Sequence, residues 1–181
     1  MDSKIVVQLK SQKSIPRAAM SILENQFFAY LSTVEADSNP HITTMFYVWD
    51  EARFRIYMIT EENSRKARNI RINNRVAVTV DERDPNSPAG NCGVLIRGRA
   101  NLVGIEEVGD VIMNKYWSKY LAFLGTAFPM GSRIVIEVVP RVLHSWKGIH
   151  FFRWINPDYE KPLYKFSQVV SSISDSSTLQ R

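Results

Sequence analysis

Short runs of aromatic and β-branched residues, separated by turn signals, recur along most of this chain and limit the folds open to it. Such runs are typical of strands, and Gly, Pro, Asn and Asp clusters mark the turns between them. The runs span residues 27–34, 41–49, 54–60, 76–80, 93–103 and 133–146. Helical patterns occupy about 14–25, 64–72 and 105–124. This order predicts a mainly β protein, an antiparallel barrel with flanking helices.

Several positions give the predicted elements their detail. Ser14 is expected to cap the first helix, with Pro16 in its first turn. The run at 41–49 is apolar on both faces and predicts a central strand. Phe54, Ile56 and Met58 share one face of the next strand. Pro140 predicts a break within the last run.

The 181 residues are enough for one domain with a proper core. We expect a single domain over residues 1–170, followed by a Ser-rich, disordered tail at 171–181. The aromatic-rich stretch at 150–166 is expected to dock on the barrel itself or on a partner subunit. An apolar run of about 20 residues, which a membrane helix needs, does not occur. With no signal-like segment at the start, the expected location is the cytoplasm.

The charge and the scarce metal-binding residues narrow the classes of ligand. A formal net charge of +5 suits a nucleic acid, an acidic membrane surface or an anionic cofactor, or simply a basic solvated surface. The single cysteine, Cys92, excludes an internal disulfide and a multi-cysteine metal site. His41, His144 and His150 lack the spacing of helical metal ligands. We therefore expect no metal centre.

A strand end, a turn and a helix start follow one another at residues 60–70. This arrangement directs the Ser64 hydroxyl, backbone N–H groups and the cationic Arg65 and Lys66 at one spot, and Thr60 ends the preceding strand toward the same space. A helix N-terminus with such residues is a receptor for a phosphate monoester. The plainer interpretation is a capped, solvated basic helix. A third interpretation is a nucleic-acid-binding surface, but no recognised binding signature accompanies the basic residues.

The order and spacing of these pieces resemble the FMN-binding split-barrel superfamily of pyridoxamine 5'-phosphate oxidase-like proteins. The resembling stretches are residues 29–34, 39–50, 56–60, 64–70, 75–81 and 96–100. The resemblance covers about the first two-thirds of the chain. It implies an antiparallel split barrel that forms a homodimer, with FMN bound in clefts at the subunit interface.

The resemblance also implies the residues that would hold FMN. The strand with Thr43, Thr44, Met45 and Phe46 would run along the flavin ring, although core packing explains Met45 and Phe46 equally well. The phosphate would be held by the residues already singled out, Thr60, Ser64, Arg65 and Lys66. Arg97 lies on a later strand, where either an approach to the cofactor or a surface role is open.

One segment departs from the true vitamin B6 oxidase. That enzyme carries an Arg-Leu-His-Asp-Arg type motif for its substrate, whereas residues 140–147 here hold Arg141 and His144 at a different spacing. The chain is more similar to a branch whose members bind FMN, a deazaflavin coenzyme or haem. His144 or His150 would be the haem ligand in the last case, and a structural histidine is the simpler interpretation.

The leading hypothesis is an FMN-dependent oxidoreductase acting on a small organic substrate. Flavin chemistry needs no nucleophile–base pair, so no catalytic side chain is assigned. One alternative keeps the fold and replaces FMN by a deazaflavin coenzyme. The other is a non-catalytic protein that binds a flavin or haem. Nucleic acid and membrane are not expected partners.

Overall fold

The computed structural model describes residues 10–11, 14–124 and 132–159. The strands are β1 (Lys10–Ser11), β2 (Phe28–Val34), β3 (Pro40–Phe46), β4 (Val48–Asp50), β5 (Arg55–Glu61), β6 (Arg75–Glu82), β7 (Cys92–Val103), β8 (Arg133–Lys147) and β9 (His150–Ile155). The helices are α1 (Arg17–Asn25), α2 (Arg65–Ile72), α3 (Ile105–Val108) and α4 (Asp110–Leu124), with a 3-10 turn η1 (Pro88–Gly90).

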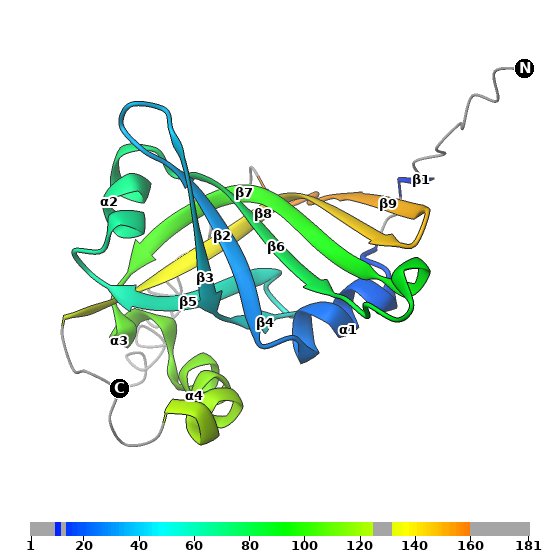
Figure 1. Ribbon diagram of the computed structural model, residues 1–181. Helices are drawn as coiled ribbons and strands as arrows, with labels where there is room; N and C mark the ends of the chain where they lie inside the picture. The colour runs from blue at the N-terminus through cyan, green and yellow to red at the C-terminus, as the bar shows by residue number, and fades with distance from the viewer. Residues whose placement is uncertain (1–9, 12–13, 125–131, 160–181) are drawn as a thin grey trace, which may run out of the picture.

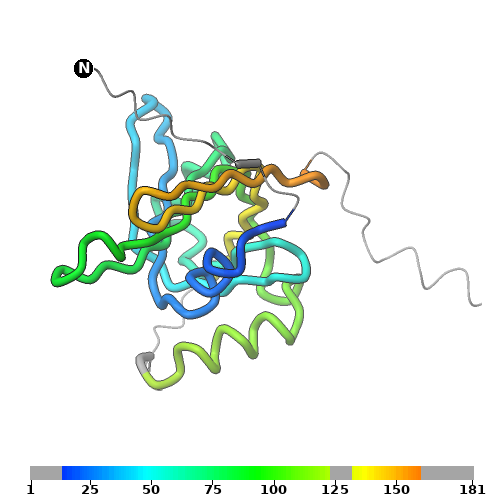
Figure 2. Tube along the Cα trace, turned by 90° about the vertical axis from the view of Figure 1, so that its right-hand side faces the viewer, coloured from blue at the N-terminus to red at the C-terminus, as the bar shows by residue number. Residues whose placement is uncertain are grey.

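The strands form one curled sheet that is antiparallel except for the short β1–β9 pair. Neighbours follow the order β1-β9-β8-β7-β6-β2-β3, and β5 joins β8 to β4. Figure 1 shows α2 beside the tip of the β2–β3 hairpin and α1 at the other end of the strands. Figure 2 shows α4 lying outside the curl. The predicted mainly β, antiparallel split barrel is confirmed.

Two apolar clusters hold the curl together. The larger one fills the barrel, where α1 contributes Leu23 and the sheet contributes residues such as Ile56, Met58 and Ile96. The smaller one joins α4 to the outside of β4, β5 and β8 through Val48 and the tyrosines of the helix. Because the barrel core covers one face of β4 and β5 and α4 covers the other, both faces of these strands carry apolar side chains. None of the described helices is long and apolar enough to cross a membrane.

The barrel is split where one continuous strand changes partners. β3 pairs with β2 as far as Phe46, and after Tyr47 the chain continues as β4, which pairs with β5. The β4–β5 ladder begins at Val48, which faces Tyr57. Before that point the described residues form no ladder between β3 and β5. The two strand edges therefore diverge and leave a gap in the barrel wall.

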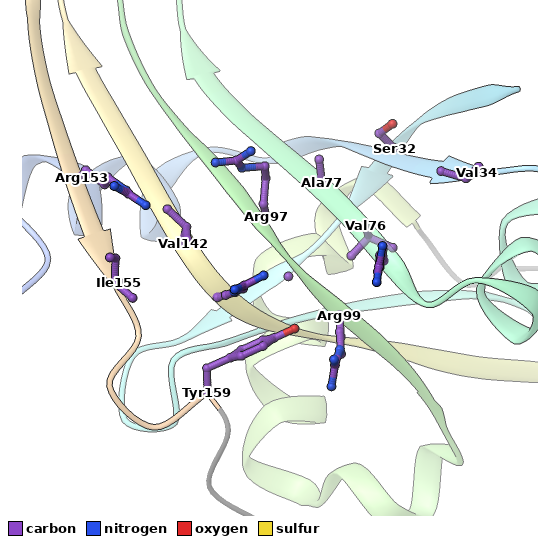
Figure 3. Close-up of a pocket in the computed structure, with 13 residues that line it drawn as sticks. Ser32, Val34, Val76, Ala77, Arg97, Arg99, Val142, Arg153, Ile155 and Tyr159 are labelled. Carbon is purple, nitrogen blue, oxygen red and sulfur yellow. The ribbon is translucent and has the colours of Figure 1, made fainter. Parts of the chain in front are cut away.

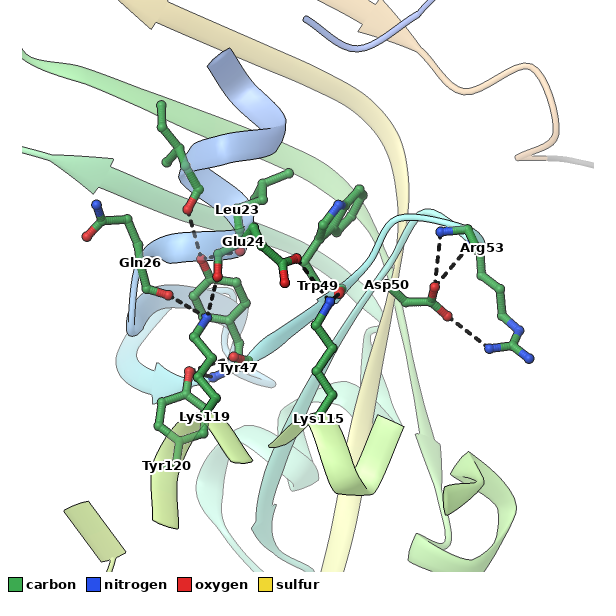
Figure 4. Close-up of polar contacts among 12 residues, drawn as sticks. Leu23, Glu24, Gln26, Tyr47, Trp49, Asp50, Arg53, Lys115, Lys119 and Tyr120 are labelled. Atoms are coloured by element: carbon green, nitrogen blue, oxygen red, sulfur yellow. Dashed lines mark hydrogen bonds and ion pairs between the residues drawn. The ribbon is translucent and has the colours of Figure 1, made fainter. Parts of the chain in front are cut away.

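A tyrosine hydroxyl satisfies the backbone at this change of partners. The Tyr120 hydroxyl accepts a hydrogen bond from Tyr47 N–H at 2.9 Å and lies 2.5 Å from Tyr47 C=O and 2.8 Å from Phe27 C=O. Tyr47 in turn donates its own hydroxyl to Leu23 C=O at 2.8 Å. Figure 4 shows these contacts where α1, β4 and α4 meet. Buried peptide groups need such partners.

Two lysines of α4 strengthen the same junction. Lys119 donates to Gln26 C=O at 2.7 Å and lies 4.5 Å from the centre of the Tyr47 ring. Burial lowers the pKa of Lys119 to about 8. Lys115 donates to Trp49 C=O at 2.8 Å and pairs with Glu24 at 3.0 Å. The helix is thus bound to the barrel by polar contacts as well as by the smaller apolar cluster.

Four local predictions are corrected by the structure. The 41–49 run is not a central strand, because β3 has a partner on one side only and leaves Ile42 66% exposed. The 105–124 helix is broken at Gly109, whose φ of 85° lies in the left-handed region. Pro140 interrupts no strand, since β8 passes it with a bulge. Ser14 is not the cap, because α1 begins at Arg17 with Pro16 at the cap position.

Two further predictions concern the strand at 54–60 and the aromatic-rich segment at 150–166. Ile56 and Met58 lie in the main core with Phe54 packed against it, as predicted. Trp154 of the aromatic stretch is buried in that core, so this part docks on the barrel itself. Residues 160–166 and the tail at 171–181 lie outside the described residues.

We expect Tyr120→Phe to lower the free energy of unfolding by about 1–3 kcal/mol, because the buried N–H and C=O of Tyr47 lose their partner. Urea unfolding followed by circular dichroism measures the change. Tyr30→Phe is the matched control, since the Tyr30 side chain is 43% exposed on the sheet. Equal stability of the Tyr120 and Tyr30 variants would show that the hydroxyl does not hold the junction.

Candidate functional site

A cavity of about 260 Å³ occupies the gap between β3 and β5. Its walls come from the last residues of both strands, the start of α2, one residue of α4 and the first residue of β8. The lining residues are Thr43, Thr44, Met45, Phe46, Ile59, Thr60, Glu61, Ser64, Lys66, Tyr116 and Arg133. Because no ladder closes this gap, the strand edges here offer main-chain donors and acceptors to a ligand.

Three polar side chains are connected at the floor of the cavity. Lys66 Nζ donates to Thr60 Oγ1 at 3.2 Å, and the Thr60 hydroxyl donates to Ser64 Oγ at 3.1 Å. Ser64 Oγ also accepts from the N–H of Ala67 at 3.4 Å, which makes it the N-cap of α2. Because both bonds are accepted by Ser64 Oγ, the Ser64 hydroxyl still has its own proton to donate.

The start of α2 is suited to an anion. Arg65 and Lys66 occupy the first helical positions, whose N–H groups have no partner within a helix. The helix dipole adds positive potential at the same place. Burial lowers the pKa of Lys66, although the nearby Glu61 carboxylate opposes this. A phosphate group beside Lys66 would restore the preference for the charged ammonium.

The structure brings together seven of the nine residues that the sequence suggests for a cofactor. These seven are Thr43, Thr44, Met45, Phe46, Thr60, Ser64 and Lys66. Arg65 does not line the cavity: its side chain is 62% exposed and pairs with Glu35 at 3.4 Å, beside the β2–β3 hairpin. Arg97 lines a different cavity, on the outer face of the sheet. His144 and His150 lie on β8 and β9 and line neither side of the β3–β5 gap.

Tyr116 and Arg133 line the cavity and were not singled out from the sequence. Tyr116 is 3% exposed, and burial raises the pKa of its hydroxyl, which therefore stays protonated at neutral pH. Its place could not be read from sequence, because the pattern of α4 does not show which strands the helix covers. Arg133 is the first residue of β8 and reaches the cavity by pairing with Glu61 of β5, a long-range contact that no local sequence signal indicates.

An apolar strip adjoins the cavity on the outer face of β2 and β3. Phe28, Tyr30 and Ile42 are 51%, 43% and 66% exposed. The Phe28 ring stacks on Phe46, a lining residue, with ring centres 5.1 Å apart. These side chains form an exposed apolar surface next to the cavity.

Comparisons with known proteins identify the family and support the fold. A sequence model of the family described as pyridoxamine 5'-phosphate oxidase matches residues 15–147. A putative pyridoxamine 5'-phosphate oxidase from Listeria innocua is 26% identical, with a TM-score of 0.53 over 68% of this chain and 91% of that one. An F420 reductase is 25% identical, with a TM-score of 0.56 over 71% of this chain and 98% of that one.

A third solved structure supports the fold alone. It is a conserved hypothetical protein from Mycobacterium tuberculosis, 22% identical, with a TM-score of 0.62 over 77% of this chain and 90% of that one. No curated protein matches the chain.

Ser64→Ala should lower the free energy of unfolding by about 1 kcal/mol, because the alanine cannot cap α2. Ser64→Gly is the matched control, with an expected loss of only a few tenths of a kcal/mol. Chemical denaturation of both variants gives the comparison. If alanine and glycine destabilise equally, the hydroxyl does not act as the cap.

Proposed function

The chain belongs to the pyridoxamine 5'-phosphate oxidase family, and on that premise we propose that it binds FMN between β3 and β5 and acts as an oxidoreductase on a small organic substrate. The single observation that carries the proposal is the open gap between the two strand edges, with the start of α2 at its floor. A flat ring with polar edge atoms suits the strand edges, and a phosphate suits the helix start.

The described side chains fit such a cofactor at both ends. One end of the cavity holds Ser64, Lys66 and the N–H groups of the first helical turn. These groups can bind a phosphate. At the other end, Met45 and Phe46 offer apolar surface to a ring. When bound, a flavin supplies the hydride or electron transfer, and the protein fixes its orientation and surroundings. The protonated Tyr116 hydroxyl can donate a hydrogen bond inside the same cavity.

We propose further that a second copy of the chain completes the site. The cavity of about 260 Å³ falls below the roughly 300–1,000 Å³ of small-molecule sites, so one chain encloses part of such a ligand. The exposed apolar strip on β2 and β3 lies beside the cavity and offers the surface for a homodimer. A cofactor at this interface would contact both subunits.

A deazaflavin coenzyme is the second candidate. An F420 reductase aligns over nearly its whole length with this chain, and another similar structure is described as a FAD-binding protein. The helix start receives a phosphate from any of these cofactors, so it does not discriminate between them. A protein that binds flavin without turnover is the non-enzymatic alternative.

An absorption spectrum of the purified protein, before and after incubation with FMN and removal of the excess, tests the cofactor. We expect retention of a two-banded flavin spectrum at one FMN per chain. Loss of FMN together with retention of a deazaflavin would favour the second candidate. Retention of neither would overturn the proposal. Turnover of a reduced nicotinamide by the loaded protein then separates an enzyme from a binding protein.

Lys66→Met should weaken FMN binding about tenfold or more, because a charge-assisted hydrogen bond to the phosphate is lost. Arg65→Met is the matched control on the same helical turn, and we expect a change of less than about threefold, since Arg65 pairs with Glu35 at the surface. Fluorescence titration of FMN gives both affinities. A larger effect at Arg65 than at Lys66 would move the phosphate outside the cavity.

A further inference from the structure

A second, larger cavity lies on the outer face of the sheet. Its volume is about 690 Å³, within the range of small-molecule sites. It spans β2, β6, β7, β8 and β9 and is bordered by Tyr159. Five arginines line it, and no Asp or Glu is among its described lining residues. These five residues, here called the arginine cluster, are Arg75, Arg97, Arg99, Arg141 and Arg153.

The strands bring these like charges together. Arg97 and Arg99 alternate with the buried Ile96 and Ala100, so they project from the outer face of β7. Arg75 of β6 stands directly opposite Arg99 in the ladder, an arrangement that is destabilising for like charges. Figure 3 shows Arg97, Arg99 and Arg153 projecting from β7 and β9 around the same space. In the described part of the chain, no member of the cluster forms an ion pair.

A bulge in β8 places Arg141. Arg97 faces Val142 whereas Gly98 faces Pro140, so Arg141 is the extra residue of the bulge. A Cβ on Gly98 would stand 2.0 Å from Val139 C=O, and only glycine fits this close approach. The bulge thus depends on a specific local sequence and directs one arginine into the cavity.

Two further residues fix the border. Asn156 is 7% exposed; its N–H donates to Arg141 C=O at 2.9 Å and its side chain donates to Pro140 C=O at 2.8 Å. The Tyr159 ring centre lies 5.5 Å from the Arg99 guanidinium carbon and 5.9 Å from that of Arg141. Contacts of cations with an aromatic ring hold their orientation. The hydrogen bonds of Asn156 and the cation–ring contacts of Tyr159 therefore fix this border of the cavity.

Two arginines of the cluster also act on a neighbouring histidine. His144 lies on β8 between the strands that carry Arg97 and Arg153. Burial, followed by the charges of these two arginines, lowers its pKa. At neutral pH the histidine is neutral and adds no charge, so the net charge of the cavity wall comes from the arginines.

We propose that the arginine cluster binds a small molecule with two or more linked anionic groups, phosphates or carboxylates. Guanidinium groups pair with such groups through two parallel hydrogen bonds, and one anion would leave most of the cluster unpaired. The arginines converge on one cavity, whereas nucleic acid is bound along an extended basic track. This site is separate from the β3–β5 cavity, with which it shares no lining residue.

Isothermal titration of the full-length protein at low salt tests the proposal, with tripolyphosphate, citrate and orthophosphate as probes. We expect saturable binding of tripolyphosphate or citrate at one equivalent per chain, at least about tenfold tighter than that of orthophosphate. The NMR signals of the His144 ring should shift on binding. No saturable binding of either polyanion would overturn the proposal.

The double variant Arg141→Gln/Arg153→Gln should weaken binding at least about tenfold. Both side chains are exposed and the Asn156 bonds use backbone oxygens, so we expect a melting temperature no lower than that of the wild type. Arg17→Gln, an exposed arginine on α1, is the matched control and should bind as the wild type does. An equal loss in the control would attribute binding to general charge and overturn the proposal.

Two competition experiments separate the site from other ligands. Excess FMN should leave tripolyphosphate binding unchanged, and displacement by FMN would show that the two cavities hold one ligand. A single-stranded oligonucleotide that binds tightly and resists displacement by tripolyphosphate would overturn the proposal in favour of nucleic acid.

Discussion

The hydroxyl of Tyr120 lies at the junction of β3 and β4, where the barrel wall changes its pairing. At Tyr47 the chain leaves β2 and joins β5, and a peptide group between two ladders has no strand partner. The Tyr120 hydroxyl meets both the N–H and the C=O of that residue. Without such a partner, burial of the junction would be costly. The split, and the cavity within it, depend on this satisfied junction.

The two cavities handle charge in different ways. The β3–β5 cavity relies on few cations, a capped helix and main-chain edges, and Glu61 tempers its positive charge. The arginine cluster relies on side chains alone and carries no described carboxylate. The first arrangement favours a ligand with one phosphate and an apolar ring. The second favours a compact ligand with several negative charges.

Much of the fold was predictable, because alternation and turn residues act locally. The runs at 54–60 and 93–103 became β5 and β7 almost at their predicted ends. The failures arise from contacts that sequence does not reveal. The 41–49 run is apolar on both faces because it spans two strands with different surroundings: Ile42 of β3 is 66% exposed, whereas Val48 of β4 is buried against α4. Gly109 breaks the long helix by adopting a positive φ, which its helical surroundings did not indicate.

The lining of the β3–β5 cavity was predictable in part. Thr60, Ser64 and Lys66 are close in sequence, so their meeting at the start of α2 follows from local geometry. Arg65 faces away because a helix turns its successive side chains by about 100°. It therefore reaches Glu35. Tyr116 enters the site through the packing of a distant helix, and no local pattern encodes that.

β8 contributes residues to both cavities, and its bulge lies between the two segments that do so. Its first half pairs with β5 along the split, and its second half pairs with β9 beside the arginine cluster. A one-residue slip in an uninterrupted strand would turn every side chain to the wrong face. The bulge absorbs the extra residue at Arg141, so each half keeps its own register. Mutation can thus change the part of this strand that lines one cavity without altering the register of the part that lines the other.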